Sequence, residues 1–428
     1  MRIAYITSGA AGMFCGSCMH DNTLAAELQR QGHDAILIPT YTPVRTDEDN
    51  VSHGRVFFGG INVFLQQKFA FFRKTPGWLD RFLDFNWLLN FLSRFAGSTQ
   101  ASQLGDLTIS MLQGELGNQA KEIDKLVDWL ASDIKPDVVV LSNVLIGGMT
   151  RRLRDRLKVP VVATLQGDDV FLEMLPEDCR NQAIDLINEH SQDMQGFIAT
   201  SRYYADFMSG YLRIPRGRID VVYPGLNLKG HVPRTSRNDV PAIGYFARIC
   251  PEKGLHNLVD AYIRLRRMRD APRCMLRVSG WLGQAQKDYF AEQWAKLQAA
   301  DLLTDVKYAE SPDLASKLSF LQSLDVLSLP TTYHEPKGLY ILEAWANGIP
   351  VVQPAHGTFP ELIEASGGGL LVAPSDPAAL ADTLRHLLNH PEEGRRLGEN
   401  GRRAVEDRFT AAEMARATLR VLERHVSQ

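Results

Sequence analysis

The 428-residue sequence has little cysteine, no excess of charge of one sign and no long apolar run. Its five cysteines, at positions 15, 18, 179, 250 and 274, are odd in number and scattered, which favours a reducing compartment over a disulfide framework. Lys and Arg number 47 against 50 Asp and Glu, a net charge of −3, so no overall positive field exists to hold nucleic acid. No stretch comes near the roughly 18 uncharged apolar residues of a membrane-spanning helix. We therefore expect a cytoplasmic protein in which any site for an anion is local.

The length and composition are those of a globular protein with more than one domain. At about 150 residues per domain, the chain predicts two or three domains. With 45% hydrophobic and 23% charged residues, the composition argues against a disordered or collagen-like chain. The N-terminal sequence MRIAYITSGAAGMFC predicts a strand, because Ile3 to Ile6 is too short for the apolar region of a signal peptide.

Short apolar runs that predict buried strands alternate with helical patterns along most of the chain. In the first half the predicted strands are 3–7, 35–39, 138–141, 159–165, 198–201 and 219–222, with helices at 23–31, 127–131, 150–157 and 203–211. In the second half the predicted strands are 242–246, 274–279, 326–329, 351–353 and 369–372, with helices at 254–267, 288–299, 338–347, 360–364 and 378–389. The polar segment 228–240 predicts a linker between the halves. This alternation predicts an α/β fold with two doubly wound parallel sheets.

The densest motif is PTTYHEPKGLYILEAWANGIPVV, residues 330–352. A helix that begins at Gly338 would leave the backbone N–H groups of Gly338, Leu339 and Tyr340 without intrahelical partners, and this positive helix end favours a phosphate. Glu343, one turn further in, can accept two hydrogen bonds from a ribose diol, and Glu335 lies just ahead of the helix, near whatever the phosphate carries. The alternative is that Glu335 complements the helix dipole and Glu343 is a surface residue.

A second motif, GYFARICPEKGLHNLVDAY, spans residues 244–262. Arg248 and Lys253 follow a predicted strand in the loop that enters the next helix, at the carboxyl edge where open α/β sheets bind ligands. An Arg engages phosphate oxygens through two hydrogen bonds and a Lys adds a point charge, so the pair would balance a nucleotide diphosphate. The alternative is that both residues are solvated surface residues.

The glycine-rich loop after the first strand gives a weaker signal. Its glycines, Gly9, Gly12 and Gly16, match no dinucleotide-binding fingerprint, and such loops are common in doubly wound folds. Cys15 and Cys18 lie in the same stretch, near a helix N-terminus that favours a thiolate. We expect this pair to serve packing or loop shape, and the alternatives are a redox pair or half of a metal site.

The combination of Arg248-x4-Lys253 with Glu335-x7-Glu343 resembles the retaining glycosyltransferases of family 4. The resemblance spans most of the chain and extends to KPDVVVLSN (135–143), PVVATLQGDD (160–169), GFIATSRYYADFM (196–208), VVYPGLN (221–227) and EASGGGLLVAPSDPAALADTL (364–384). It implies the GT-B fold, in which two Rossmann-like doubly wound domains face a cleft.

The resemblance also implies roles for the motif residues. Arg248 and Lys253 would bind the donor diphosphate, Glu343 the ribose, and Glu335 the transferred sugar as a catalytic residue. The donor phosphates would also contact the backbone N–H groups at the helix start, from Gly338, Leu339 and Tyr340.

Some residues depart from the family pattern. Many members have a histidine where this chain has Gln166, and because Gln cannot titrate near neutral pH, hydrogen bonding at the reaction centre is its expected role. Lys337 stands where an aromatic residue is common, and it either assists phosphate binding or points to solvent. The glycine loop would face the interdomain cleft and approach donor phosphate or acceptor. Asp168 follows a strand at the cleft-facing edge, with helix capping as its alternative.

The implied domains are an acceptor-binding domain at 1–232, a donor-binding domain at 233–405, and a C-terminal helix at 406–428 that crosses back to the first domain. The implied activity is retaining transfer of a hexose from a nucleotide diphosphate sugar to a hydroxyl of a glycan or lipid-linked acceptor. No metal and no cofactor are expected, because cations and a helix N-terminus supply the charge stabilisation. The alternatives are a nucleotide-sugar epimerase or a hydrolase of the same fold, and a non-catalytic nucleotide- or sugar-binding protein.

Residues 57–95 form an aromatic-rich segment that carries charges too often for a membrane span. This segment resembles the first-domain insertion of glycogen and starch synthases, which favours glucose from a UDP or ADP donor. Its rings would suit stacking on a sugar, or contact with lipid at the inner face of a membrane. The alternative is the ordinary core of a helical insertion.

Overall fold

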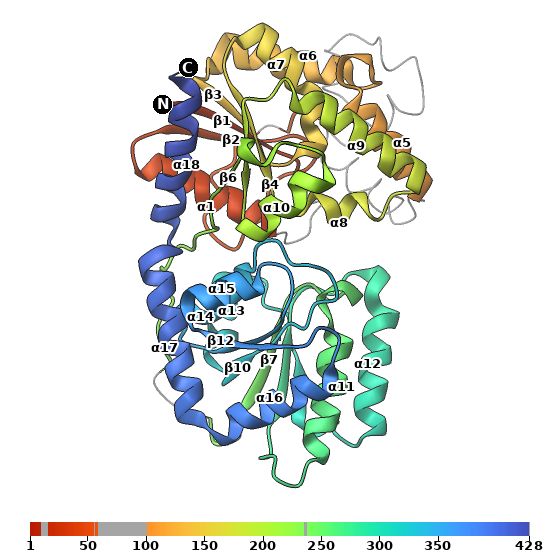
Figure 1. The fold of residues 1–428 in the computed structure, drawn as a ribbon, viewed down its shortest axis with the longest axis vertical. Helices are drawn as coiled ribbons and strands as arrows, with labels where there is room; N and C mark the ends of the chain where they lie inside the picture. Colours follow the sequence, from red (N-terminus) through yellow and green to blue (C-terminus); the bar gives the residue numbers. More distant parts are fainter. Residues whose placement is uncertain (10–15, 55, 59–100, 235–237, 428) are drawn as a thin grey trace. The chain divides into compact units, whose positions relative to one another are not determined.

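The structure is a computed structural model that describes residues 1–9, 16–54, 56–58, 101–234 and 238–427. Contacts within the chain divide it into two compact units. Unit 1 comprises Met1–Val222 together with Ala415–Gln428, and unit 2 comprises Tyr223–Met414. Each unit contains one sheet of six strands with helices around it (Figure 1).

The sheet of unit 1 has the strand order β2-β1-β3-β4-β5-β6, and all neighbouring strands are parallel. Its strands are nearly continuous apolar runs, because helices cover both faces of a parallel sheet. They are β1 (Arg2–Thr7), β2 (Asp34–Pro39), β3 (Val138–Leu141), β4 (Val161–Leu165), β5 (Gly196–Ala199) and β6 (Ile219–Val221).

The helices of unit 1 connect these strands and cover the sheet. Those that follow β1, β4 and β5 along the chain are α1 (Gly16–Arg30), α8 (Asp168–Leu172) and α10 (Arg202–Tyr211). The others are α5 (Ala101–Leu112), α6 (Ala120–Trp129), α7 (Thr150–Leu157), α9 (Glu177–Ser191) and α18 (Ala411–Val426). Arg424 of α18 pairs with Asp220 of β6 at 2.6 Å, which ties the C-terminal helix to the edge strand of unit 1.

The sheet of unit 2 has the order β12-β11-β10-β7-β8-β9 and is also parallel throughout. Its strands are β7 (Ala242–Phe246), β8 (Met275–Ser279), β9 (Val306–Tyr308), β10 (Val326–Leu327), β11 (Val351–Pro354) and β12 (Gly369–Val372). The chain adds strands in one direction from β7 to β9 and in the other from β10 to β12. The switch point therefore lies between β7 and β10, where open α/β sheets bind ligands at the carboxyl ends of their strands.

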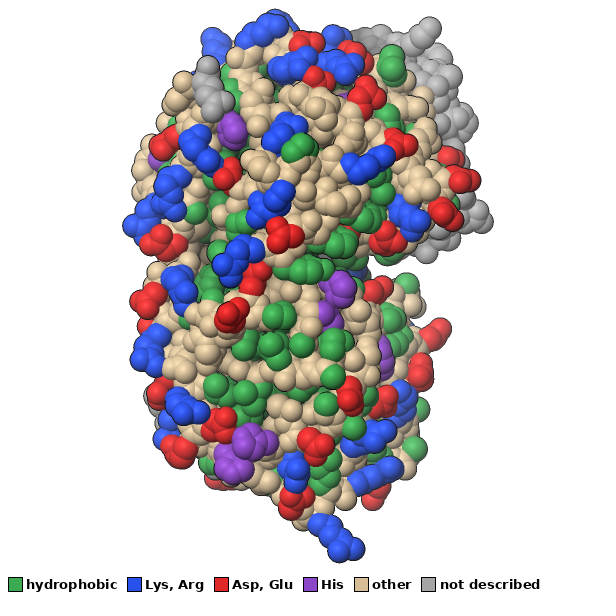
Figure 2. All heavy atoms as spheres, in the orientation of Figure 1, with side chains coloured by type: hydrophobic (Ala, Val, Ile, Leu, Met, Phe, Trp, Pro, Cys, Tyr) green, Lys and Arg blue, Asp and Glu red, His purple; other side chains and the backbone are tan. Residues whose placement is uncertain are grey.

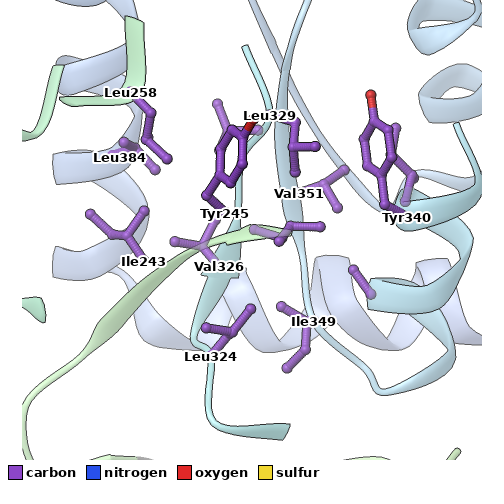
Figure 3. Close-up of a cluster of buried hydrophobic side chains, with 14 of the residues drawn as sticks. Ile243, Tyr245, Leu258, Leu324, Val326, Leu329, Tyr340, Ile349, Val351 and Leu384 are labelled. Atoms are coloured by element: carbon purple, nitrogen blue, oxygen red, sulfur yellow. The ribbon is translucent and has the colours of Figure 1, made fainter. Parts of the chain in front are cut away.

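The helices of unit 2 are α11 (Leu255–Arg267), α12 (Lys287–Ala299), α13 (Leu314–Gln322), α14 (Leu339–Ala346), α15 (Phe359–Ser366), α16 (Pro377–Asn389) and α17 (Pro391–Arg408). Figure 1 shows α11 and α16 side by side on the sheet. Their buried side chains belong to a core that includes Tyr245, Leu258, Val351 and Leu384, all labelled in the close-up of Figure 3. The predicted α/β class with two doubly wound parallel sheets is confirmed.

The surface carries both signs of charge. On the face drawn in Figure 2, basic and acidic side chains are interspersed over each unit, in line with the net charge of −3. Among the described residues, no helix is long and apolar enough to cross a membrane.

Candidate active site

The candidate site of unit 2 starts in the loop between β7 and α11. After β7 the chain passes the exposed Arg248 and a short 3-10 turn, and Gly254 caps α11 with a φ of +73°. A Cβ atom at Gly254 would lie 1.9 Å from the carbonyl oxygen of Pro330, so only glycine lets this loop contact the loop after β10. This approach brings Lys253 to Glu335, with 2.8 Å between Nζ and Oε2.

The loop after β10 leads into the buried helix α14. Gly338 is its N-cap, with a φ of +68°, and Leu339 is its first residue. The backbone N–H groups of Lys337 and Gly338 both donate to Oε1 of Glu335, each at 3.3 Å. The next two N–H groups, of Leu339 and Tyr340, have no hydrogen-bond partner among the described residues. These two, rather than the Gly338 N–H, remain for an anion at the helix N-terminus.

Glu335 is a buried carboxylate surrounded by hydrogen-bond donors. Its exposed fraction is 4%, and its Oε2 accepts from Lys253, from the Tyr333 hydroxyl and, at 3.2 Å, from the Tyr340 hydroxyl. Burial alone would raise the pKa of Glu335, but the Lys253 charge and these hydrogen bonds outweigh it and lower the pKa to about 2. Glu335 is therefore a fixed negative charge near neutral pH and not an acid or base.

Two tyrosine rings hold the Lys253 ammonium. Its Nζ lies 4.8 Å from the ring centroid of Tyr333 and 5.2 Å from that of Tyr340, within the range of cation–π attraction. Figure 3 shows Tyr245 and Tyr340 with their hydroxyls pointing the same way, away from Leu324 and Ile349. The phenol groups thus border the site while their rings belong to the core.

Two further cations accompany Lys253. Lys337 is only 8% exposed, and its charge contributes to the low pKa of Glu335, so the alternative in which it points to solvent is wrong. Arg248 is exposed, and its guanidinium has no partner among the described residues. These two loops also carry the carboxylates of Glu252 and Glu335, so the three cations leave a net positive charge there, which favours an anion such as a diphosphate.

Glu343 lies in the middle of α14 and forms a buried ion pair. Its Oε1 accepts from Nζ of Lys317 on α13 at 2.7 Å, and the two residues are 3% and 6% exposed. The alternative of a surface position for Glu343 is therefore wrong. A diol that binds Glu343 has to share its carboxylate with Lys317.

Sequence reasoning did not find Lys317 or Tyr333. Lys317 stands in the segment LASKLSFLQ, where no motif distinguishes it from a solvated helix residue. Tyr333 could have been noticed only from its position, because it precedes Glu335 by two residues in the same loop.

In unit 1 the glycine loop is only partly described. Gly9 follows β1 with a φ of +79°, and a Cβ atom there would lie 2.1 Å from the Thr42 carbonyl oxygen, so the position requires glycine. Gly16 is the first residue of α1, and Cys18 is 2% exposed. The predictions for Gly12 and Cys15 concern positions outside the described residues.

Gln166 follows β4 in a buried polar network. It is 4% exposed, and its amide nitrogen donates to Asp21 Oδ1 at 2.9 Å and to the Ser142 carbonyl at 2.8 Å. Asp21 is fully buried and also accepts from the hydroxyls of Tyr5 at 2.9 Å and Thr7 at 3.0 Å. The amide of Gln166 is thus engaged by the scaffold of unit 1.

Asp168 closes the turn between β4 and α8. Its carboxylate accepts from the backbone N–H groups of Val144 at 2.9 Å and Gln166 at 3.0 Å, and it is 3% exposed. Burial raises its pKa to about 6. These hydrogen bonds connect the segment after β3 with the segment after β4.

Most of the predicted aromatic segment 57–95 lies outside the described residues. Phe57 and Phe58 are described and are buried in the unit 1 core, 4.6 Å from Trp129 and 5.5 Å from Tyr41 between ring centroids. Across the described ranges, no three His, Cys, Asp or Glu side chains group to hold a metal ion.

Fold and site together define a protein of two Rossmann-like units, one of which carries a cationic site at its switch point. Family models identify the class further. The model for glycosyl transferases group 1 matches residues 231–404, and the model for the glycosyl transferase 4-like domain matches residues 22–225. The chain belongs to the group 1 glycosyltransferases, which confirms the predicted family.

Curated relatives are similar over part of their length. An MMP alpha-(1->4)-mannosyltransferase from Mycolicibacterium hassiacum is 30% identical over 52% of this chain and 52% of its own. A D-inositol 3-phosphate glycosyltransferase from Corynebacterium efficiens is 30% identical over 62% of this chain and 66% of its own. The matches thus span about half to two thirds of these relatives.

Solved structures match over the whole chain. The sucrose-phosphate synthase of Thermosynechococcus elongatus has a TM-score of 0.72 at 18% identity, covering 99% of both chains. Anabaena HepE in complex with UDP-glucose has a TM-score of 0.68 at 16% identity, covering 99% of this chain and 100% of its own. These likenesses confirm the GT-B fold.

Proposed function

We propose that this protein is a retaining glycosyltransferase that moves a sugar from a nucleotide diphosphate donor to an acceptor hydroxyl. The observation that carries the proposal is the buried, ionised Glu335 at the switch point of unit 2, beside the cations Lys253 and Lys337 and the N-terminus of α14. Unit 2 then binds the donor, and unit 1 provides the acceptor site.

Each charged group has a role in this proposal. Arg248 and Lys253 bind the diphosphate, together with the N–H groups of Leu339 and Tyr340. Glu343 accepts hydrogen bonds from the ribose. Glu335 faces the transferred sugar, where its charge stabilises the positive charge that develops as the glycosidic bond breaks.

The transfer keeps the anomeric configuration. The bond between the anomeric carbon and the diphosphate oxygen breaks, and the acceptor oxygen forms its bond on the same face of the sugar. The leaving phosphate takes the proton of the acceptor hydroxyl. The cations stabilise the negative charge on the leaving diphosphate, and no enzyme nucleophile takes part.

A UDP donor that carries glucose is the favoured substrate. HepE, whose fold this chain shares, is solved with UDP, with UDP and glucose, and with UDP-glucose. Glycogen synthases from Mycobacterium tuberculosis are 31% identical over 44% of this chain. The acceptor is a hydroxyl of a glycan or of a lipid-linked sugar.

A product assay with UDP-glucose, ADP-glucose and GDP-mannose tests the proposal. The expected result is a new α-linked glycoside and free nucleoside diphosphate, since these donors carry the sugar in the α configuration. An epimerase would instead return a nucleotide sugar, and a hydrolase would release free sugar without an acceptor. A β-linked product would contradict retention, and no turnover of any nucleotide sugar would contradict the transferase proposal.

A further inference from the structure

Lys253 is already engaged in the structure. Its Nζ donates to Glu335 and to the Tyr333 hydroxyl, and the side chains of Lys253 and Glu335 are 17% and 5% exposed. The proposed function requires the same ammonium to bind the donor diphosphate. The two demands compete, because release of the ammonium removes the cation that is hydrogen-bonded to this buried carboxylate.

The Glu335 carboxylate is also fully occupied. It receives five donors, which are the Lys253 ammonium, the hydroxyls of Tyr333 and Tyr340, and the backbone N–H groups of Lys337 and Gly338. An ionised carboxylate offers about four lone-pair positions. A sugar hydroxyl can therefore bond to Glu335 only if one of these donors leaves.

Lys253 is the donor that can leave. The two backbone donors are fixed, because the neighbouring loop packs on this segment: the Thr358 N–H donates to the Glu335 carbonyl at 2.9 Å, and a Cβ at Gly357 would lie 2.7 Å from the Glu335 nitrogen. The ring of Tyr340 is held in the core. Lys253 alone has a long flexible stem, and it alone gains a new anion when a diphosphate arrives.

We propose that the donor diphosphate takes Lys253 from Glu335, and that Tyr333 is the positioning residue that holds Glu335 after Lys253 leaves. This inference rests on the proposed donor site. The released position on Glu335 becomes available to a hydroxyl of the sugar. A nucleoside diphosphate without its sugar breaks the ion pair and leaves that position unfilled, whereas the complete donor fills both.

The exchange predicts an unusual effect of Glu335→Gln. Without the carboxylate, Lys253 has no ion pair to break, so UDP should bind about three- to tenfold more tightly than to the wild type. Loss of charge repulsion between Glu335 and the phosphates is the competing explanation for tighter binding. The two causes separate in a Lys253→Met background, because only the exchange needs Lys253.

Calorimetric titrations of UDP, ADP and GDP test the exchange in wild type, E335Q, K253M and the K253M/E335Q double variant. We expect E335Q to bind the preferred diphosphate more tightly, K253M more weakly, and the double variant within twofold of K253M. Equal tightening with and without Lys253 shows repulsion alone and overturns the exchange, as does weaker binding by E335Q. Wild type that binds none of the three, or K253M equal to wild type, contradicts the donor site itself.

A matched control comes from another buried carboxylate of unit 2. Asp305 pairs with Arg266 and Arg273, both at 2.7 Å, and precedes β9 at the amino edge of the sheet. Asp305→Asn breaks an ion pair of the same kind away from the site. The affinity of Asp305→Asn for the diphosphate should stay within twofold of wild type. Tighter binding by this variant would mean that the E335Q effect comes from a general loosening of the unit 2 structure.

Tyr333→Phe tests the positioning role, and it also covers the case in which K253M does not fold. We expect its kcat to fall about tenfold, with UDP affinity within threefold of wild type. In the E335Q background the same change should have no further effect on kcat, because its target carboxylate is absent. Additive losses in the two backgrounds, or a wild-type kcat, would overturn the role of Tyr333.

Discussion

At the carboxyl edge of the unit 2 sheet, Arg248 is exposed without a partner among the described residues, and Glu335 is held ionised by its neighbours. At the carboxyl edge of the unit 1 sheet, Gln166 and Asp168 are 4% and 3% exposed and bond to other parts of the scaffold. The edge of the unit 2 sheet thus carries charged side chains, whereas the polar side chains at the edge of the unit 1 sheet form hydrogen bonds within the scaffold. Residues at equivalent edges of the two Rossmann-like units therefore differ in role: those of unit 2 suit ligand binding, and those of unit 1 support the scaffold.

The buried ion pair beneath the unit 2 site gives the largest expected effect. Lys317→Met leaves the Glu343 carboxylate buried without its 2.7 Å partner, which should cost about 3–5 kcal/mol of stability. Chemical denaturation followed by far-UV circular dichroism measures the loss. Lys317→Arg keeps the charge and should recover most of the stability, and a wild-type midpoint for Lys317→Met would show that the pair contributes little.

The role of Glu335 gives the next largest effect. Glu335→Gln should lower kcat by a factor of about 10² to 10³, the scale of one preorganised electrostatic group, without loss of nucleotide affinity. Glu343→Gln should mainly raise the donor KM, because its hydrogen bonds to ribose exist in ground and transition state alike. Steady-state kinetics with the true donor separate the two. Reversed phenotypes would exchange the two residues in the site, and a wild-type kcat for Glu335→Gln would remove its role.

Gln166 tests whether the polar residues of unit 1 support its structure. Gln166→Leu removes two buried hydrogen bonds, to Asp21 and to the Ser142 carbonyl, and each is worth about 0.5–1.5 kcal/mol. We expect a lower melting temperature and unchanged UDP affinity. A variant with wild-type stability and a large loss of kcat would instead assign Gln166 to the reaction centre.

Asp168 gives the smallest effect, a dependence of stability on pH. Its pKa is raised from 3.8 to about 6, so the folded chain holds this proton more tightly than the unfolded chain. Stability should therefore fall as pH rises between these values, by comparison with Asp168→Asn, which cannot titrate. Urea midpoints measured across this range test the sign, and parallel profiles for the two proteins would contradict the raised pKa.

The sequence predicted the fold class because strand and helix patterns alternate clearly, but some elements escaped it. The three-residue β9 is too short to show a period, and α13 and α9 carry polar residues through their apolar faces. Tertiary contacts, rather than local pattern, stabilise these elements. A short strand such as β10, followed at once by the site loop, is also longer in the prediction than in the structure.

The residues of the candidate site were also only partly predictable from the sequence. Arg248, Lys253, Glu335 and Glu343 stand at fixed spacing within two motifs, so the sequence alone could single them out. Their partners could not be predicted, because Lys317 lies 26 residues from Glu343 and meets it only through the packing of α13 on α14. Charge types are visible in a sequence, whereas the pairing of charges is a property of the folded chain.

The affinity of the protein for UDP, with Arg248→Ala beside it, tests the central claim that unit 2 presents a donor diphosphate site. Arg248 is exposed and unpaired among the described residues, so its truncation leaves the fold intact. Arg264→Ala, a change at another exposed arginine near the far end of α11, is the control. Calorimetry should show UDP binding about 10- to 100-fold weaker in Arg248→Ala and unchanged in Arg264→Ala. Equal UDP affinity in wild type and both variants would contradict the assignment of the donor site to this edge of the sheet.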